Sequence, residues 1–278
     1  MEHRAGENPG MRAVAVLGHL AIDRIEGSEP QPGGGPFHAA RMLRVLQRPA
    51  LLLVSSAAAD KPLLLPPLVR LGIPVTWRES SATACFAMEY DGDRRRMIMD
   101  EIGDPWRPED IAASRVLDDV GWAHVAPLAR SDFPPETLAA LARGRRLSLD
   151  GQGLVRPARK GPLELDADYD PAMLEHVSIL KLAEEEAVAL VGETGEQALR
   201  TLGVPEVIVT LGSRGSIVLA DGLAEHVPAR GIPTPDPTGA GDAFSAAYLV
   251  ARSNRLDPTA AARWASAAVA GLLSGRLR

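Results

Sequence analysis

The chain has 278 residues, of which 46% are hydrophobic, 24% charged and only 4% aromatic. Its net charge of −6 argues against nucleic acid as a general partner, and no apolar run is long enough to span a membrane. The chain has one cysteine, Cys85, so an internal disulfide is ruled out. This cysteine content and the absence of a signal-peptide pattern lead us to expect a reducing cytoplasm as the location.

Short aliphatic strands and helices alternate along the chain. Residues 19–31 are expected to form loop or edge structure, and the Pro/Gly run at 32–36 to break the chain. Such alternation predicts an α/β fold with a mostly parallel sheet covered on both faces, in one domain over residues 1–278. Strands are predicted at 13–18, 51–54, 75–77, 122–125, 146–150, 178–180, 206–210 and 215–219. Helices are predicted at 37–46, 63–71, 134–142, 184–191 and 197–202, and another is predicted to begin near Ala240. The last predicted helix has Asp257 as its N-cap and runs from Pro258 to about residue 273.

Residues 84–100 interrupt the alternation with a predicted β-hairpin. Two segments, 84–90 and 94–100, flank Asp91-Gly92, which is a strong turn signal. A hairpin here indicates a small β appendage rather than another core strand. Its exposed edge could pair across a homodimer. Cys85 falls in its first strand, where we expect a buried and inert thiol.

The stretch from Asp236 to Phe244, Asp-Pro-Thr-Gly-Ala-Gly-Asp-Ala-Phe, carries the most chemical information. An apolar run follows it, so a helix is expected to open near Ala240. The first amides of a helix lack intrahelical partners and lie at the positive end of its dipole. Because Gly239, Ala240 and Gly241 have little side-chain bulk, a phosphate could approach those amides closely. Asp242 would lie beside that anion, although an acid in a first turn also simply complements the dipole.

This stretch resembles the signature of the PfkB (ribokinase-like) carbohydrate kinases, and Pro237 departs from it where the family often has Thr. The resemblance implies a three-layer αβα sandwich with a small β lid, here segments of about 19–32 and 82–101. It also implies that Gly239, Ala240 and Gly241 form an anion hole and that Asp242 is the catalytic base. The GHLAID start, the triple glycine and the DGQGLVR segment look closest to the myo-inositol and small sugar kinase branch.

The same resemblance implies a binding site for ATP and Mg²⁺. Residues 210–215 are similar to the family's TxGxxG segment, which lies along the nucleotide, although a Gly-rich turn explains them about as well. Glu186 matches the Glu of an Asn-x-x-Glu segment that organises hydrated Mg²⁺, but Ala183 replaces the Asn and three consecutive acids also fit a solvated helix start. The loop at Asp236 is a candidate for a monovalent cation, K⁺. The implied donor-side residues are Thr210, Gly212, Ser213, Gly215, Thr238 and Glu186, and the implied metal-site residues are Glu186 and Asp236.

Candidate acceptor-side residues follow predicted strands, at the edge where parallel sheets bind ligands. Asp23 resembles the family's N-terminal Asp, which accepts hydrogen bonds from substrate hydroxyls. Gly33 and Gly34 resemble its Gly-Gly hinge, and His38 takes a position normally held by Asn. His38 could equally be a helix-start residue satisfied locally. Arg156 could bridge substrate or phosphate, or hold its own loop.

We therefore expect an ATP-dependent kinase that phosphorylates a hydroxyl of a small sugar, polyol or nucleoside. A catalytically silent binding or regulatory protein on the same scaffold is the alternative, and the loss of the Asn at Ala183 supports it. A pyridoxal-type kinase is a second enzyme hypothesis, but the predicted hairpin favours a sugar kinase. The sequence contains no GxxxxGK[ST], HExxH, CxxC or GxSxG motif, and no dinucleotide fingerprint follows the first strand.

Overall fold

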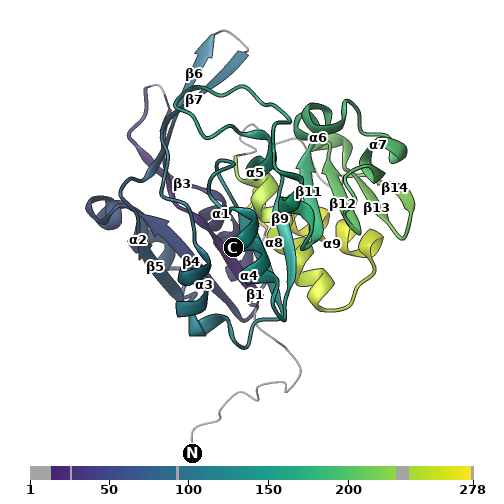
Figure 1. The fold of residues 1–278 in the computed structure, drawn as a ribbon, viewed down its shortest axis with the longest axis horizontal. Coiled ribbons are helices and arrows are strands. Elements are labelled where there is room, and N and C mark those ends of the chain that lie inside the picture. The colour runs from purple at the N-terminus through teal and green to yellow at the C-terminus, as the bar shows by residue number, and fades with distance from the viewer. Residues whose placement is uncertain (1–13, 26, 92–93, 230–237, 277–278) are drawn as a thin grey trace, which may run out of the picture.

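The computed structural model describes residues 14–25, 27–91, 94–229 and 238–276, and it is organised around a nine-stranded sheet (Figure 1). The strand order is β14-β13-β12-β11-β9-β8-β1-β4-β5. The seven strands from β12 to β5 in that order pair in parallel, while β13 and β14 add an antiparallel edge. The strands are β1 Val14–His19, β4 Ala50–Ser56, β5 Val75–Glu79, β8 Trp122–Ala126, β9 Arg146–Asp150, β11 Val177–Ala183, β12 Glu206–Thr210, β13 Ser216–Ala220 and β14 Leu223–Val227.

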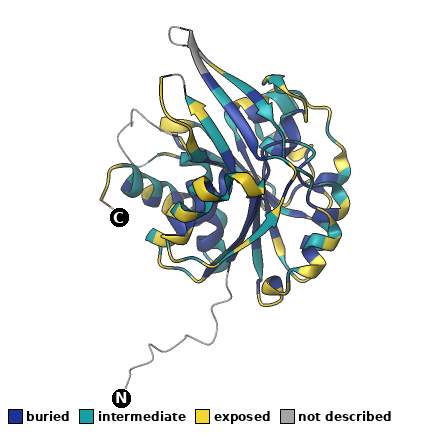
Figure 2. Ribbon diagram, turned by 90° about the vertical axis from the view of Figure 1, so that its left-hand side faces the viewer, coloured by how far each residue is buried: buried dark blue, intermediate teal, exposed yellow. Residues whose placement is uncertain are grey.

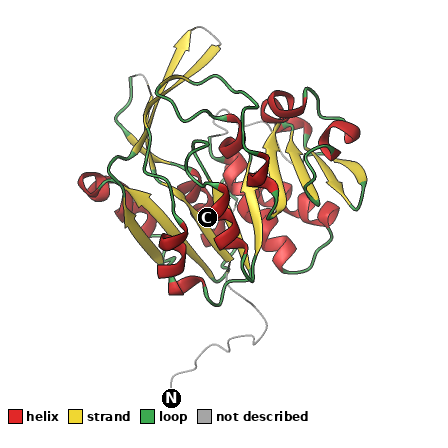
Figure 3. Cartoon of the chain, viewed as in Figure 1, coloured by secondary structure: helices red, strands yellow, loops and turns green. Residues whose placement is uncertain are grey.

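Helices cover both faces of this sheet (Figure 3). The α-helices are α1 Gly35–Val45, α2 Lys61–Val69, α3 Pro108–Ala113, α4 Pro135–Ala142, α5 Gln152–Val155, α6 Glu184–Val191, α7 Glu196–Arg200, α8 Ala240–Ser253 and α9 Pro258–Leu273. Helices α1, α2, α8 and α9 contribute to one core, and α3, α4, α6 and α7 contribute to the other. None of the helices in the described part of the chain combines the length and apolar composition that a membrane crossing requires.

Central strands are buried on both faces because side chains alternate across the sheet. In β1, Val14 and Val16 belong to the first core, whereas Ala15 and Leu17 belong to the second. The ribbon coloured by burial shows the central strands dark blue between helices whose outer surfaces are yellow and teal (Figure 2). This architecture confirms the predicted three-layer α/β fold.

A second, five-stranded sheet with the order β10-β7-β6-β2-β3 lies beside the main one. It contains β2 Ala21–Ile25, β3 Gln31–Gly33, β6 Ala84–Asp91, β7 Arg94–Glu101 and β10 Gly161–Pro162. The predicted hairpin is confirmed as β6 and β7, and Cys85 is buried in it. Residues 19–31 were expected to form loop or edge structure, which is wrong for β2. It is an interior strand, because its backbone pairs with both β3 and β6.

Most predicted elements are confirmed to within two residues, and α6 and β12 have the predicted bounds. The predicted break at 32–36 is confirmed only at Gly34, because β3 extends to Gly33 and α1 already begins at Gly35. Sequence patterns did not reveal β14 or α3. The β14 strand is mostly exposed, so it lacks the aliphatic run that marked the buried strands.

Candidate active site

The first turn of α8 lies at the carboxyl edge of the parallel strands. The helix begins at Ala240 with Gly239 as N-cap, and Gly239 has a left-handed backbone with φ of +74°, which glycine adopts without strain. Residues 243–251 are all buried, so a continuous apolar run fixes the helix against the sheet. Asp242 is the acid in its first turn. The predicted helix start is therefore confirmed.

Glycines of the 33–35 run separate two carboxylates. A Cβ atom added to Gly35 would lie 2.9 Å from Asp242 Oδ1. A Cβ atom added to Gly33 would lie 2.8 Å from Asp23 Oδ1 and closer still to Asp23 Oδ2. Gly34, the N-cap of α1, has φ of +93°. The run therefore passes between the predicted substrate residue Asp23 and the predicted base Asp242, and only glycine leaves room for both side chains.

His38 packs against the turn that precedes Asp242. A Cβ at Gly239 would overlap the His38 ring, so the absence of a side chain at Gly239 permits this contact. His38 also makes an edge contact with Phe37, with 5.5 Å between ring centroids. The predicted substrate residue thus lies next to the predicted anion hole, on the neighbouring helix α1.

Lys181 carries a buried positive charge beneath that turn. Its Nζ donates to Asp150 Oδ2 at 3.1 Å, and the two side chains are only 6% and 1% exposed. A Cβ at Gly241 would lie 3.0 Å from the same Nζ. Asp150 ends β9, and Lys181 of the neighbouring strand β11 is in register with it, two residues before β11 ends. A fixed cation therefore lies against the Gly-Ala-Gly turn.

Burial and neighbouring charges adjust the proton affinity of Asp242. Withdrawal from water and the negative charge of Asp150 raise the pKa of Asp242 to about 6, while Lys181 and Arg156 oppose that rise. For Lys181, burial favours the neutral amine. The carboxylates of Asp150, Glu186 and Asp242 outweigh it and raise its pKa, so Lys181 stays charged. Asp242 is thus a carboxylate at neutral pH that accepts a proton more readily than an ordinary Asp.

Glu186 and His124 complete the buried polar group around Lys181. Glu186 is 4% exposed and accepts a hydrogen bond from the Ala183 amide at 2.8 Å through Oε2. Burial raises its pKa, against the opposing charge of Lys181. His124 contacts Ser148 Oγ at 3.1 Å, and burial lowers the pKa of His124 to about 4, so it is neutral at physiological pH.

Residues 210–215 form a glycine-dependent turn after β12. Thr210 Oγ1 donates to the Leu182 carbonyl at 3.1 Å, which ties the end of β12 to β11. Gly212 and Gly215 have φ of +58° and +103°, and a Cβ at Gly215 would overlap the Val227 carbonyl. Ser213 is exposed between them. This turn is close to α6, because Arg214 forms an ion pair with Glu184.

Arg156 links the site to the small sheet. It follows the short helix α5, and its guanidinium lies 5.8 Å from the Phe86 ring centroid on β6. Its positive charge opposes the rise in the pKa of both Asp242 and Glu186. The Arg156 side chain is therefore within electrostatic reach of the site while it contacts the hairpin strand.

The sequence of this chain matches a known protein family. The model described as pfkB family carbohydrate kinase matches residues 106–274, which is more than half of the 278 residues. The chain belongs to the PfkB family of carbohydrate kinases. It is also 33% identical to mouse (Mus musculus) ribokinase over 122 residues, a match that covers 40% of this chain and 36% of that protein. The matched region thus spans about a third of the curated relative.

Solved structures with the same fold cover nearly all of this PfkB chain. A pyrophosphate-dependent kinase of the ribokinase family, complexed with a pyrophosphate analog and myo-inositol, superposes with a TM-score of 0.80 at 24% identity, over 95% of this chain and 97% of that one. Arabidopsis thaliana ribokinase, complexed with ribose and ATP, gives 0.73 at 21% identity, over 95% and 93%. At these identities the likeness establishes the fold, which agrees with the family match.

In the PfkB fold, the predicted residues Asp23, Gly33, Gly34 and His38 belong to β2, β3 and the start of α1, and His38 contacts Gly239 at the start of α8. The predicted residue Glu186 lies within electrostatic range of Lys181, which contacts Gly241. Asp236 lies outside the described residues, so the prediction of a monovalent cation site at Asp236 remains a prediction. Thr238 is exposed just before the Gly239 N-cap.

No group of three or more His, Cys, Asp or Glu side chains in the described residues is arranged to hold a metal ion. Mg²⁺ usually keeps several waters and binds through one or two carboxylates plus substrate phosphates, so it does not require such a cluster. Glu186 fits this mode of binding, because only its Oε2 is engaged by the Ala183 amide and its carboxylate lies near the site.

Lys181, Asp150 and His124 were not predicted as site residues. A signal for the first two was present, because Lys181 interrupts an aliphatic strand and Asp150 ends another one. A lysine inside a buried parallel strand requires a carboxylate partner, and the end of a neighbouring strand is a natural place for it. Nothing local marked His124, whose environment depends on residues from several strands.

Proposed function

We propose that this protein transfers the terminal phosphoryl group of ATP to a hydroxyl of a small sugar or polyol. The observation that carries the proposal is Asp242, a partly buried carboxylate in the first helical turn, directly after the small-residue turn 239–241. At this position a base and the first amides of α8 would face the same point, where a hydroxyl and a phosphate would meet. The PfkB family match supports the same reaction class.

In the proposed step Asp242 accepts the proton of the acceptor hydroxyl as its oxygen attacks the γ-phosphorus. The new phosphorus–oxygen bond forms as the bond to the β-phosphate oxygen breaks, and ADP leaves. The amides of Gly239, Ala240 and Gly241 stabilise the charge on the transferred group, which is where phosphoryl transfer needs most help. Lys181 adds a fixed positive charge next to Gly241.

Mg²⁺, when bound, would supply positive charge that offsets the charge of the donor phosphates. Glu186 is the residue we assign to hold the hydrated ion, since one of its oxygens is already oriented by the Ala183 amide. That hydrogen bond positions Glu186 without the Asn that Ala183 replaces. The substitution therefore does not by itself argue for a catalytically silent protein.

The acceptor end of the proposed site consists of Asp23, Gly33, Gly34 and His38. A carboxylate and an imidazole are suited to bind neighbouring hydroxyls, and the glycines let a sugar or polyol ring approach the backbone. The small sheet would act as a lid that excludes water during transfer. Its strand β6 reaches Arg156 through Phe86, so the Arg156 loop would follow the lid as it moves.

Pyrophosphate is the second candidate donor. The solved structure with a pyrophosphate analog superposes more closely than the ATP complex, with TM-scores of 0.80 and 0.73. Both donors present the same terminal phosphoryl group to the turn at 239–241. They differ in whether a nucleoside must lie beyond it, near residues 210–215. A comparison of both donors is therefore part of the decisive experiment.

The experiment is a phosphoryl-transfer assay with the purified chain, Mg²⁺, and ATP or pyrophosphate. The acceptor panel contains polyols including myo-inositol, pentoses, hexoses and nucleosides, and phosphorus NMR identifies the product. We expect one donor and one acceptor class to give a phosphate ester. Asp242→Asn should lower kcat by about 10²–10⁴-fold with unchanged circular dichroism.

Near wild-type turnover in Asp242→Asn would remove Asp242 from its proposed role. Saturable binding of ATP and of an acceptor, measured calorimetrically, without phosphate ester from any pair would instead favour the silent binding protein. Addition of K⁺ in place of Na⁺ tests the candidate cation loop at Asp236. A sedimentation experiment on the same preparation tests the proposed homodimer.

A further inference from the structure

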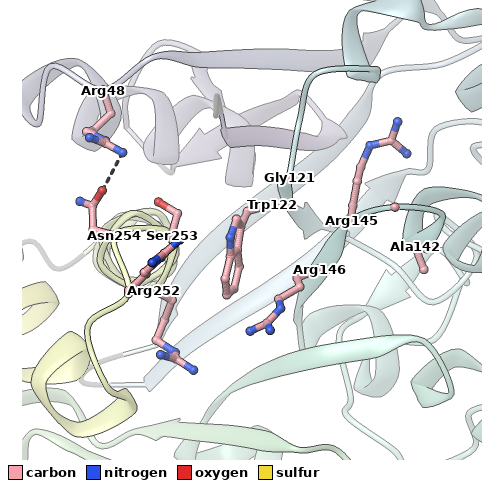
Figure 4. A pocket seen from close by; sticks show the side chains of 11 residues that line it. Arg48, Gly121, Trp122, Ala142, Arg145, Arg146, Arg252, Ser253 and Asn254 are labelled. Atoms are coloured by element: carbon pink, nitrogen blue, oxygen red, sulfur yellow. Dashed lines mark hydrogen bonds between the residues drawn. The ribbon is translucent and has the colours of Figure 1, made fainter. Parts of the chain in front are cut away.

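A second charged recess lies at the opposite edge of the main sheet from the candidate active site. It is a groove of about 970 Å³ near the amino ends of β8 and β9 and the carboxyl end of α8 (Figure 4). Its volume is in the range of cavities that hold small ligands. Helix α8 connects the two places, since it begins at the Gly-Ala-Gly turn and ends at Ser253, which lines the groove.

Five arginines line this groove, and none of the described residues that line it is acidic. This contrasts with the whole chain, which has a net charge of −6. Positive charge is thus concentrated in one concave place on an acidic protein. The arginines are Arg48, Arg145, Arg146, Arg252 and Arg255.

Neutral groups hold two of these guanidinium groups in position. Arg145 donates to the Leu117 carbonyl through Nε and Nη2, at 3.1 and 2.8 Å, and to the Leu141 carbonyl at 3.2 Å. Arg48 donates to the Asn254 side-chain oxygen at 2.8 Å. Carbonyl oxygens satisfy donors but carry no net charge, so the contacts of Arg145 orient its guanidinium without neutralising it.

Arg252 differs, because Glu206 neutralises it. Its Nε and Nη2 donate to the Glu206 carboxylate at 2.9–3.1 Å. This ion pair anchors the carboxyl end of α8. Among the described residues, no carboxylate lies within 4.0 Å of Arg145, Arg146 or Arg255.

Arg146 and Trp122 form a platform inside the groove. The Arg146 guanidinium lies 5.2 Å from the Trp122 ring centroid, and Figure 4 shows the two side chains extending side by side. Arg146 is exposed and Trp122 is partly buried. An arginine stacked on an aromatic face keeps its in-plane N–H donors free for an oxyanion.

We propose that this groove binds a small polyphosphate anion, either an inorganic polyphosphate or the phosphate chain of a nucleotide. Planar guanidinium groups bind phosphate oxygens in pairs, and several of them in one recess match a ligand with several phosphates rather than a single carboxylate. The site is separate from the proposed transfer reaction and does not depend on it.

Binding is tested on the full chain with inorganic tripolyphosphate, and in parallel with AMP-PNP. Trp122 is a local reporter, so its fluorescence contribution is obtained by subtracting the signal of Trp122→Phe from that of the wild type. The test variant is Arg146→Gln/Arg255→Asn, with Asn at 255 because φ there is +67° and Asn tolerates that backbone. The control, Arg70→Gln/Arg159→Gln, removes two exposed charges outside the groove.

We expect a saturable Trp122-dependent signal with tripolyphosphate in the wild type and in the control. The test variant should bind at least about tenfold more weakly, because two charge-assisted contacts are lost. Equal affinity for AMP-PNP assigns the phosphate chain as the ligand, and tighter AMP-PNP binding assigns the nucleotide. The proposal is overturned if neither probe gives a Trp122-dependent signal at millimolar concentration, or if the test variant binds as tightly as the wild type.

Discussion

The Lys181 ammonium donates to the Asp150 carboxylate at 3.1 Å across two adjacent parallel strands, and both side chains are almost fully buried. Glu186 and Asp242 add two more carboxylates within electrostatic range of the same ammonium. One cation thus compensates several buried anions at the carboxyl edge of the sheet. Removal of Lys181 would leave these carboxylates without their compensating cation, whereas removal of one carboxylate would leave Lys181 with others.

Replacement of Lys181 by Met should lower the free energy of unfolding by about 3–5 kcal/mol, because it leaves the Asp150 carboxylate buried without its cation. The double variant Lys181→Met/Asp150→Asn should recover part of that loss, since no buried charge then remains at the pair. Urea denaturation at pH 7 measures both effects. The matched control is Lys160→Met, whose exposed ion pair with Glu101 is worth only about 0–1 kcal/mol. Equal losses at 181 and 160 would contradict the buried role.

The acidic limb of the pH–rate profile should report Asp242. Its pKa is raised to about 6, so kcat/KM should increase as pH rises through about 6 and level off above it, because only the carboxylate accepts a proton. Arg156 lowers this pKa and Asp150 raises it. Arg156→Gln should therefore move the limb to higher pH and Asp150→Asn to lower pH. Initial rates from pH 4.5 to 8.5 measure the shifts. A shift in the same direction for both variants would mean that another group controls the limb.

Asp242→Asn should stabilise the protein at neutral and higher pH. The pKa of Asp242 is raised from 3.8 to about 6, so the folded state binds this proton more tightly than the unfolded state. Stability therefore falls as pH rises from about 4 to 6 and stays lower above, by on the order of 1–3 kcal/mol. An Asn has no such loss. Urea denaturation of both proteins at pH 4 and pH 8 should show a gain for the variant only at pH 8, and an equal difference at both pH values would contradict the linkage.

Local sequence patterns were sufficient for the framework and for one end of the site. The alternation of aliphatic strands and helices fixed the α/β class, and Gly239 to Asp242 marked the start of α8 correctly because helix starts and glycine turns are local features. The exposed strand β14 was missed, since its alternation includes too few apolar residues. Strand β2 was misjudged, because its partners β3 and β6 come from different parts of the chain.

The buried charges could not be predicted from spacing alone. Lys181 and Asp150 are 31 residues apart, and their contact exists only because β11 and β9 are adjacent in the sheet. The arginines of the groove likewise come from the ends of several elements, from Arg48 after α1 to Arg255 after α8. Strand order determines which polar ends meet, and no single stretch of sequence contains that information.

Gly33→Ala should weaken acceptor binding with little effect on stability. The new Cβ would overlap the Asp23 carboxylate, which would have to move by about an ångström, while the backbone at Gly33 needs no left-handed conformation. We expect kcat/KM for the acceptor to fall by about ten- to a hundredfold and KM for the donor to stay constant, because Asp242 and the turn at 239–241 are untouched. Gly195→Ala is the control, since Gly195 has φ of −71° and an added Cβ there meets only the flexible Glu193 side chain, at 3.2 Å. Unchanged acceptor kinetics in Gly33→Ala would show that Asp23 does not bind the acceptor.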